Sequence, residues 1–209
     1  MFIHQIPSFV PRIFPKLHWQ GKHSQDEPHV YFTFDDGPCP EITNFVLDEL
    51  NKYQAKASFF CIGKNMAEFP ELTQQIIQAG HGIGNHTMHH ANAWKMDQVS
   101  YLKEIDDCQQ VISSFGIQSI GFRPPYGRFG KSFYRNNATN LKTYMWSILT
   151  GDYNTSLNPN HIIVSCKKAL KPGAILVFHD SVKAFPLLKM ILPALLQECI
   201  QKGLKPISL

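Results

Sequence analysis

Two adjacent carboxylates, Asp35 and Asp36, end the apolar stretch VYFTFD and are followed by Gly37 and Pro38. Neighbouring side chains on a strand point to opposite faces, and a carboxylate left unpaired at the edge of an apolar core is costly. An Asp-Gly-Pro run is also common in turns, so a capped turn is the alternative explanation. The doublet therefore predicts charged partners elsewhere in the chain.

The segment HGIGNHTMHH contains His86 and His90, whose H-x-x-x-H spacing predicts two imidazoles on one side of a helical turn. Alone, this spacing is weak evidence, because such pairs often lie on a surface without a ligand. An aspartate from the first strand would complete a set of two neutral imidazoles and one carboxylate, the donor set of a hydrolytic metal centre with an open position for water. One aspartate of the doublet would then bind the cation, and its neighbour would handle protons.

Three further polar groups follow apolar stretches: Arg123 in FRPPYGR, Asp152 in TGDYN, and His179 at the end of AILVF. The prolines after Arg123 stiffen a loop that could aim its guanidinium. Asp152 would position an acid or a base if it pairs with Arg123 or His179. The alternatives are a solvated arginine, a turn aspartate and a core histidine.

Trp94, in ANAWKM, has an aromatic face suited to a sugar ring, but we expect it to pack within its own loop. Cys39 lies near the aspartate doublet without a base to activate it, so we do not expect a thiol nucleophile.

Strands and helices have to position these groups. In the sequence, short apolar runs alternate with longer amphipathic stretches, a pattern that is typical of a β/α chain. Asn158 followed by Pro159 suits a helix start, and Gly173 and Gly203 suit helix ends. The predicted strands are 30–35, 57–62, 82–85, 120–123, 143–148, 174–179 and 204–208. The predicted helices are 40–53, 64–79, 97–115, 131–140, 158–170 and 185–202.

This alternation suits either an open doubly wound sheet or a barrel of parallel strands, and both bind ligands at the carboxyl ends of their strands. The candidate groups gather after the predicted strands, as this rule requires. We therefore treat them as one site in a single domain, 30–209, preceded by a Pro-rich entry segment, 1–29.

Composition excludes several classes of function. The 209 residues carry a formal net charge of +4 with no long basic run, so we expect no nucleic-acid partner. Five widely spaced cysteines predict free thiols. No stretch is long enough to span a membrane, and prolines interrupt the N-terminal apolar residues without a leader pattern, so we expect a cytoplasmic protein, with export as the alternative. The oligomeric state is left open.

From about residue 30 onward the chain resembles the polysaccharide deacetylase family, also called carbohydrate esterase family 4, with its NodB homology domain. Four ordered motifs carry the resemblance: TFDDGP at 33–38, HTMHH at 86–90, RPPYG at 123–127 and FHD at 178–180. The resemblance implies a distorted (β/α) barrel of about seven parallel strands, which decides between the two architectures.

The resemblance also implies roles for individual residues. Asp35 would be the general base, oriented by Arg123, and His179 the general acid. One divalent cation, with zinc expected and cobalt or another transition metal as the alternative, would be bound by Asp36, His86 and His90. The Tyr126 backbone N–H would stabilise an oxyanion. The family's fourth motif has Asp-Trp where this chain has Asp152 and Tyr153, and Val177 replaces the usual leucine, so the wall of the acyl pocket differs.

The implied reaction removes N-acetyl groups from an N-acetylglucosamine glycan, such as peptidoglycan or a chitin-type oligosaccharide, and releases acetate. An O-acetyl esterase acting on xylan or another acetylated sugar is the second enzymatic hypothesis. A catalytically silent glycan-binding module is the hypothesis from another class, although no ligand or base is missing from the motifs.

Overall fold

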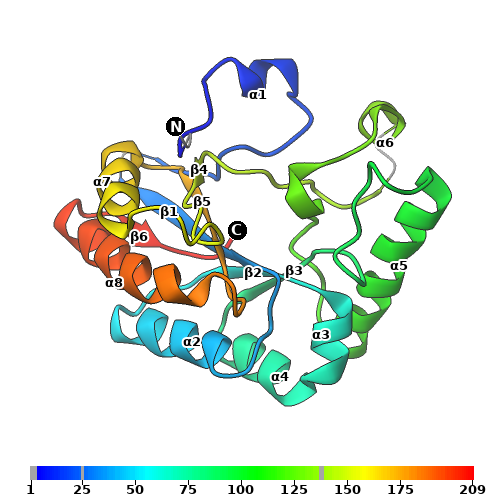
Figure 1. The fold of residues 1–209 in the computed structure, drawn as a ribbon, viewed down its shortest axis with the longest axis horizontal. Helices are drawn as coiled ribbons and strands as arrows, with labels where there is room; N and C mark the ends of the chain where they lie inside the picture. Colours follow the sequence, from blue (N-terminus) through cyan, green and yellow to red (C-terminus); the bar gives the residue numbers. More distant parts are fainter. Residues whose placement is uncertain (1–3, 25, 137–138) are drawn as a thin grey trace.

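Parallel strands form the centre of the molecule (Figure 1). The computed structural model describes residues 4–24, 26–136 and 139–209. All strand pairs are parallel, and the sheet order is β3-β2-β1-β5-β4, with β6 pairing with the start of β1. The strands are β1 (His29–Asp35), β2 (Ser58–Cys61), β3 (Gly82–Asn85), β4 (Ile148–Leu149), β5 (Ile175–His179) and β6 (Lys205–Pro206).

Irregular bridges continue the sheet beyond β3. Phe122 pairs with Asn85 on one side and with Thr143 on the other, and the same segment that contains Thr143 runs on into β4 beside β5. The ring of parallel segments is thereby completed, so the predicted single-domain, distorted (β/α) barrel is confirmed, and the open sheet is excluded.

The predicted strands 120–123 and 143–148 are wrong in extent, since regular pairing survives there only as single bridges and in β4. Gly121 explains part of the irregularity. Its φ is 154°, and a Cβ there would lie 2.5 Å from the Lys142 carbonyl oxygen, so only glycine fits this approach of two segments. Pro124 then ends the extended run, because proline cannot donate to a ladder.

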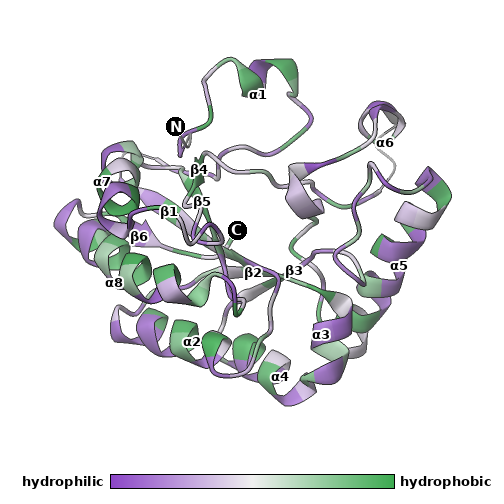
Figure 2. Ribbon diagram, viewed as in Figure 1, coloured by the Kyte–Doolittle hydropathy of each residue, from purple (hydrophilic) through white to green (hydrophobic). Residues whose placement is uncertain are grey.

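Helices cover the outside of the barrel, and their apolar residues face the strands (Figure 2). The predicted helix 64–79 is two helices, because Pro70 begins a new one. The predicted helix 131–140 extends to Asn136, and residues 137 and 138 lie outside the described residues. The helices are α1 (Val10–Ile13), α2 (Ile42–Lys52), α3 (Gly63–Glu68), α4 (Pro70–Gln78), α5 (Gln98–Ser114), α6 (Lys131–Asn136), α7 (Pro159–Ala169) and α8 (Phe185–Gln201), with a 3₁₀ turn at Pro125–Gly127.

Side chains of β1 alternate between two environments, as expected for a strand. Val30, Phe32 and Phe34 pack in the main core beneath the helices, where Phe34 stacks on Phe178 at 5.3 Å between ring centroids. Thr33 and Asp35 have the opposite parity and contact Arg123, which is completely buried. The carboxylate at the end of β1 therefore has a buried cation as its partner.

The entry segment lies against the barrel through isolated bridges from Gln5 to Ile148, from His18 to Tyr144 and from Gln20 to Ala174. The domain boundary at residue 30 remains a prediction. Among the helices that the structure describes, none combines the length and apolar character needed to cross a membrane.

Candidate active site and metal centre

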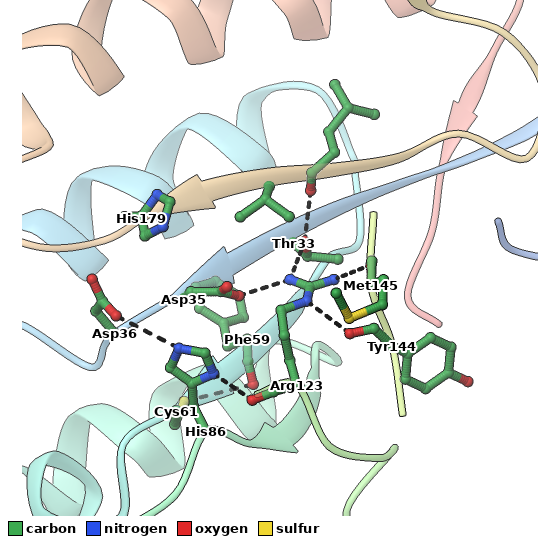
Figure 3. A network of polar contacts seen from close by, with 12 residues as sticks. Thr33, Asp35, Asp36, Phe59, Cys61, His86, Arg123, Tyr144, Met145 and His179 are labelled. Atoms are coloured by element: carbon green, nitrogen blue, oxygen red, sulfur yellow. Dashed lines mark hydrogen bonds and ion pairs between the residues drawn. The ribbon is translucent and has the colours of Figure 1, made fainter. Parts of the chain in front are cut away.

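Three potential metal ligands, Asp36, His86 and His90, converge beyond the carboxyl ends of β1 and β3. Figure 3 shows two of them, Asp36 and His86. The Asp36 Oδ1 atom lies 3.3 Å from Nε2 of His90 and 3.7 Å from Nε2 of His86. One ligand atom from each of the three residues lies within 4.8 Å of the other two. This spacing allows one ion to contact all three atoms.

The chemistry of these donors fits a cation. Asp36 Oδ1 is buried without any hydrogen-bond partner among the described residues, which is costly for a carboxylate oxygen unless an ion satisfies it. Burial lowers the pKa of His86 to about 4 despite the nearby Asp35 and Asp36, so its imidazole is neutral at neutral pH. His86 Nδ1 donates to the Arg123 carbonyl oxygen at 2.7 Å, which turns Nε2 toward Asp36.

The histidines lie in a loop, so the predicted helical turn is wrong. Thr87 and His90 have left-handed backbones, with φ of 67° and 55°. Asn85, which is fully buried, fastens this loop, since its side chain accepts from the Thr87 N–H at 2.9 Å and donates to the Ile105 carbonyl oxygen at 2.8 Å.

Asp180 fastens the loop that carries Asp36. Its carboxylate accepts from the Gly37 N–H at 3.0 Å and from the Thr43 hydroxyl at 2.6 Å. A Cβ at Gly37 would lie 2.0 Å from the Asp180 carboxylate, so glycine is required for this approach. Burial, opposed by the Thr43 hydrogen bond, raises the pKa of Asp180 to about 8.

Asp35 and Arg123 form a buried ion pair on one side of the metal ligands. The Arg123 guanidinium donates to Asp35 at 2.7 Å and to Thr33 at 2.6 Å, and it also donates to the Tyr144 and Met145 carbonyl oxygens (Figure 3). Burial would raise the pKa of Asp35, but the charges of Arg123, His86 and His179 and the Arg123 hydrogen bond lower it overall. Asp35 is therefore held as a carboxylate.

His179 and Asp152 form a second pair, at the end of β5. His179 Nδ1 lies 2.8 Å from one Asp152 oxygen, and the His179 backbone N–H donates to the other oxygen at 2.8 Å. Burial would lower the pKa of His179, but the charge and hydrogen bond of Asp152, with the charges of Asp36 and Asp35, raise it to about 9. Asp152 is thus paired with His179, and not with Arg123.

A cavity of about 380 Å³ opens above these groups. Tyr126, Tyr153 and Val177, the three predicted substrate contacts, all line it. The Tyr153 ring lies 4.9 Å from that of His179, edge to face. Tyr126 has a left-handed backbone, with φ of 60°. The cavity therefore brings together the three metal ligands, one member of each charge pair (Asp35 and His179) and the predicted wall residues. The roles of these residues remain predictions.

The sequence reasoning missed several residues at the site. Thr33 and Asn85 fasten the charged groups, and Trp146, Leu149 and Lys183 line the cavity. Thr33 and Asn85 each lie two or fewer positions from a predicted site residue, so position along the chain was the available signal. Trp94, which we expected to pack within its loop, is 68% exposed.

Known proteins resemble the whole of this architecture. The family model described as polysaccharide deacetylase matches residues 22–146, more than half of the chain. A chitooligosaccharide deacetylase from Bradyrhizobium sp. is 34% identical over 154 residues, which cover 72% of this chain and 70% of that protein. A peptidoglycan-N-acetylglucosamine deacetylase from Bacillus cereus is 33% identical over 162 residues, which cover 74% of each.

Structural comparison agrees with the sequence comparison. The crystal structure of a peptidoglycan N-acetylglucosamine deacetylase superposes with a TM-score of 0.80 at 27% identity, covering 98% of this chain and 95% of that one. The chain therefore belongs to the polysaccharide deacetylase family and is a hydrolase.

Proposed function

We propose that the protein is a metal-dependent N-deacetylase that hydrolyses the acetamido group of an N-acetylglucosamine-containing glycan. One observation carries the proposal. The buried Asp36 Oδ1, which has no hydrogen-bond partner in the described part of the chain, lies between the Nε2 atoms of His86 and His90. It is flanked by the Asp35 carboxylate, held charged, on one side and by the His179 imidazole, held protonated, on the other.

Asp36, His86 and His90 would hold the cation, and their mixed nitrogen and oxygen donor set suits zinc, with cobalt or another transition metal as the alternative. A cation there would polarise the amide carbonyl and lower the pKa of a water molecule bound beside it.

Asp35 acts as the general base. Its Oδ1 is engaged by Arg123, which leaves Oδ2 to accept the proton of the attacking water. Arg123 also fixes the carboxylate in direction, because its own guanidinium is anchored to Thr33 and to two backbone carbonyl oxygens.

His179 acts as the general acid. Asp152 engages its Nδ1, so the proton on Nε2 is available to the departing amine. Cleavage of an amide needs this protonation, since without it the nitrogen would have to leave as an amide anion, which is a very poor leaving group. Val177, Leu149 and Tyr153 supply an apolar wall for the acetyl methyl group. The names of the two curated relatives support a glycan of N-acetylglucosamine as the substrate.

The test is acetate release from N-acetylglucosamine oligomers by the zinc-loaded protein. Asp35→Asn should lower kcat/KM by about 10²- to 10⁴-fold, the usual contribution of a general base. Asp107→Asn, which changes an exposed carboxylate paired with Lys103 on α5, is the matched control and should leave the rate unchanged. A chelator should abolish acetate release, and added zinc should restore it.

Three results would contradict the proposal. Full activity after chelation would exclude a metal-dependent reaction. Acetate release from acetylated xylan but not from the amide substrates would identify an esterase, whose leaving alcohol needs the acid less. Glycan binding measured by calorimetry without any acetate would identify a silent binding module.

A further inference from the structure

Trp94 is exposed beside the active-site cavity without lining it. Its side chain is 68% exposed, whereas Trp19 is 8% exposed and Trp146 is partly buried. Large apolar side chains scattered singly on a surface need no explanation, so exposure alone assigns nothing to Trp94. A role is indicated instead by the contacts that hold the Trp94 ring in place and by the residues that surround it.

The Trp94 ring is held in place. Its Nε1 donates to the Phe129 carbonyl oxygen at 3.3 Å, and its backbone N–H donates to the Asn92 side chain at 3.0 Å. The Arg128 guanidinium lies 4.6 Å from the ring centroid. Arg128 therefore covers part of the ring, and the remainder is open to solvent in a fixed orientation.

A row of rings and cations connects Trp94 with the metal ligands. The rings of His90 and Tyr126 lie 4.6 Å apart, and the Arg128 guanidinium lies 5.5 Å from the Tyr126 ring as well as against Trp94. Tyr126 is itself 59% exposed. The surface that begins at the metal ligand His90 thus continues without interruption to Trp94.

A second hollow, of about 420 Å³, lies along this row. Gly127 borders both this hollow and the active-site cavity, so the two are adjacent. Its apolar walls are Phe14, Trp19, Trp94, Phe129, Tyr134 and Met145. We call this hollow the Trp94 groove.

The lining of the Trp94 groove suits a sugar ring. Aromatic faces can pack against the C–H face of a pyranose, and the adjoining cations can donate hydrogen bonds to its oxygen atoms. Lys131 and Arg135 line the groove, and none of its described lining residues is acidic. An acyl chain would leave these donors unused.

We propose that Trp94, with Arg128 and the Trp94 groove, binds a second sugar ring of the glycan whose acetylated ring occupies the active-site cavity. This inference rests on the proposed function. Because Trp94 does not line the active-site cavity, a single sugar there does not reach it. The preferred substrate is therefore an oligosaccharide, and Trp94 is a residue that determines chain-length preference.

The test compares kcat/KM for N-acetylglucosamine and its dimer, trimer and tetramer. In the unaltered enzyme kcat/KM should rise with chain length. In Trp94→Ala the ratio between trimer and monosaccharide should fall about tenfold, which corresponds to the upper range for one aromatic contact. Trp94→Phe should restore most of the ratio, and Val99→Ala, at another exposed apolar residue, should keep it.

A second measurement needs no turnover. Binding of the trimer should shift tryptophan emission to shorter wavelength, and Trp94→Phe should remove most of that shift, because Trp94 is the tryptophan most open to water. An unchanged length ratio in Trp94→Ala, or an unchanged emission shift in Trp94→Phe, would overturn the inference. A higher kcat/KM for alkyl glycosides, without a higher kcat/KM for the trimer, would also overturn the inference. It would indicate that the Trp94 groove binds an acyl chain.

The two proposals fail differently. If no substrate releases acetate, the deacetylase proposal is wrong, while the emission shift still reports on the Trp94 groove. If acetate is released with the same chain-length preference in Trp94→Ala, only the Trp94 inference is wrong.

Discussion

Two charge pairs with opposite protonation preferences define the chemistry at the scale of single residues. Arg123 beside Asp35 favours the deprotonated carboxyl, and Asp152 beside His179 favours the protonated imidazole. Pairs of titratable groups whose environments move their pKa values apart indicate which one is the base and which one is the acid. The assignment of Asp35 and His179 therefore follows from their partners as well as from the motifs.

Asp152→Asn should change the pH dependence of catalysis. The pKa of His179 is raised to about 9, so the acid is protonated at neutral pH and is lost as the pH rises through that value. Without the Asp152 charge, burial lowers this pKa, and the alkaline limb of the kcat/KM profile should move down by at least about one pH unit. Rates measured between pH 6 and about 10 would show the shift.

The same pair affects stability in the same direction. A raised pKa of His179 in the folded protein stabilises the fold fully below the ordinary pKa of histidine, and this contribution disappears as the pH rises through about 9.

An alkaline limb of the kcat/KM profile that stays in place in Asp152→Asn would argue against His179 as the acid.

At the scale of elements, the loops after the strands position the site, and these loops were the hardest part to predict. Apolar runs and their terminal polar groups indicated β1, β3 and β5 with the residues that follow them. The loop 86–90 was mistaken for a helical turn, because its left-handed residues are a threonine and a histidine, and neither residue type signals that backbone. The exposure of Trp94 likewise depends on tertiary packing, which no local pattern encodes.

Asn85→Ala should weaken metal binding. Both hydrogen bonds of its side chain hold the loop between the two histidine ligands in place, and loss of such a supporting group typically costs about 10- to 100-fold in metal affinity. Calorimetric titration of the metal-free protein with zinc would measure the loss of affinity.

Asn158→Ala is the matched control, since it removes the same side chain from the start of α7. The Asn158 oxygen accepts from the N–H groups of Asn160 and His161, so the variant should lose about 1 kcal/mol of stability. Its zinc affinity should stay unchanged, because Asn158 does not line the active-site cavity. Equal zinc affinity in both variants would show that Asn85 has no supporting role.

At the scale of the whole molecule, the barrel depends on pairings between distant parts of the chain. The alternation of strands and helices alone left an open sheet and a barrel equally possible, and the family resemblance decided between them. The physical reason is that closure depends on Gly121 and on single bridges at Phe122 and Thr143, which produce no regular strand pattern.

Zinc should stabilise the entire fold. No described residue forms a hydrogen bond with the buried Asp36 Oδ1, whereas the unfolded chain exposes this oxygen to water. A ligand at 100 times its Kd adds about 2.7 kcal/mol, so the unfolding temperature should rise by roughly 5 to 10 °C. Calorimetry with and without a chelator would measure this rise.

Asp36→Ala should abolish the response to zinc, and Asp107→Ala should retain it, since Asp107 lies on the exposed pair with Lys103. Equal unfolding temperatures with and without zinc in the unaltered protein would contradict a shared metal site.

The pairing of β1 with β5 has a consequence for biosynthesis. β1 is buried between β2 and β5, and its register with β5 joins Tyr31 to Ile175. A ribosome delivers β5 long after β1, so the nascent chain carries an apolar strand with one open edge through most of translation. Chaperones that shield open strand edges should therefore improve the yield of this protein, and synonymous codons that slow elongation before β5 should reduce it.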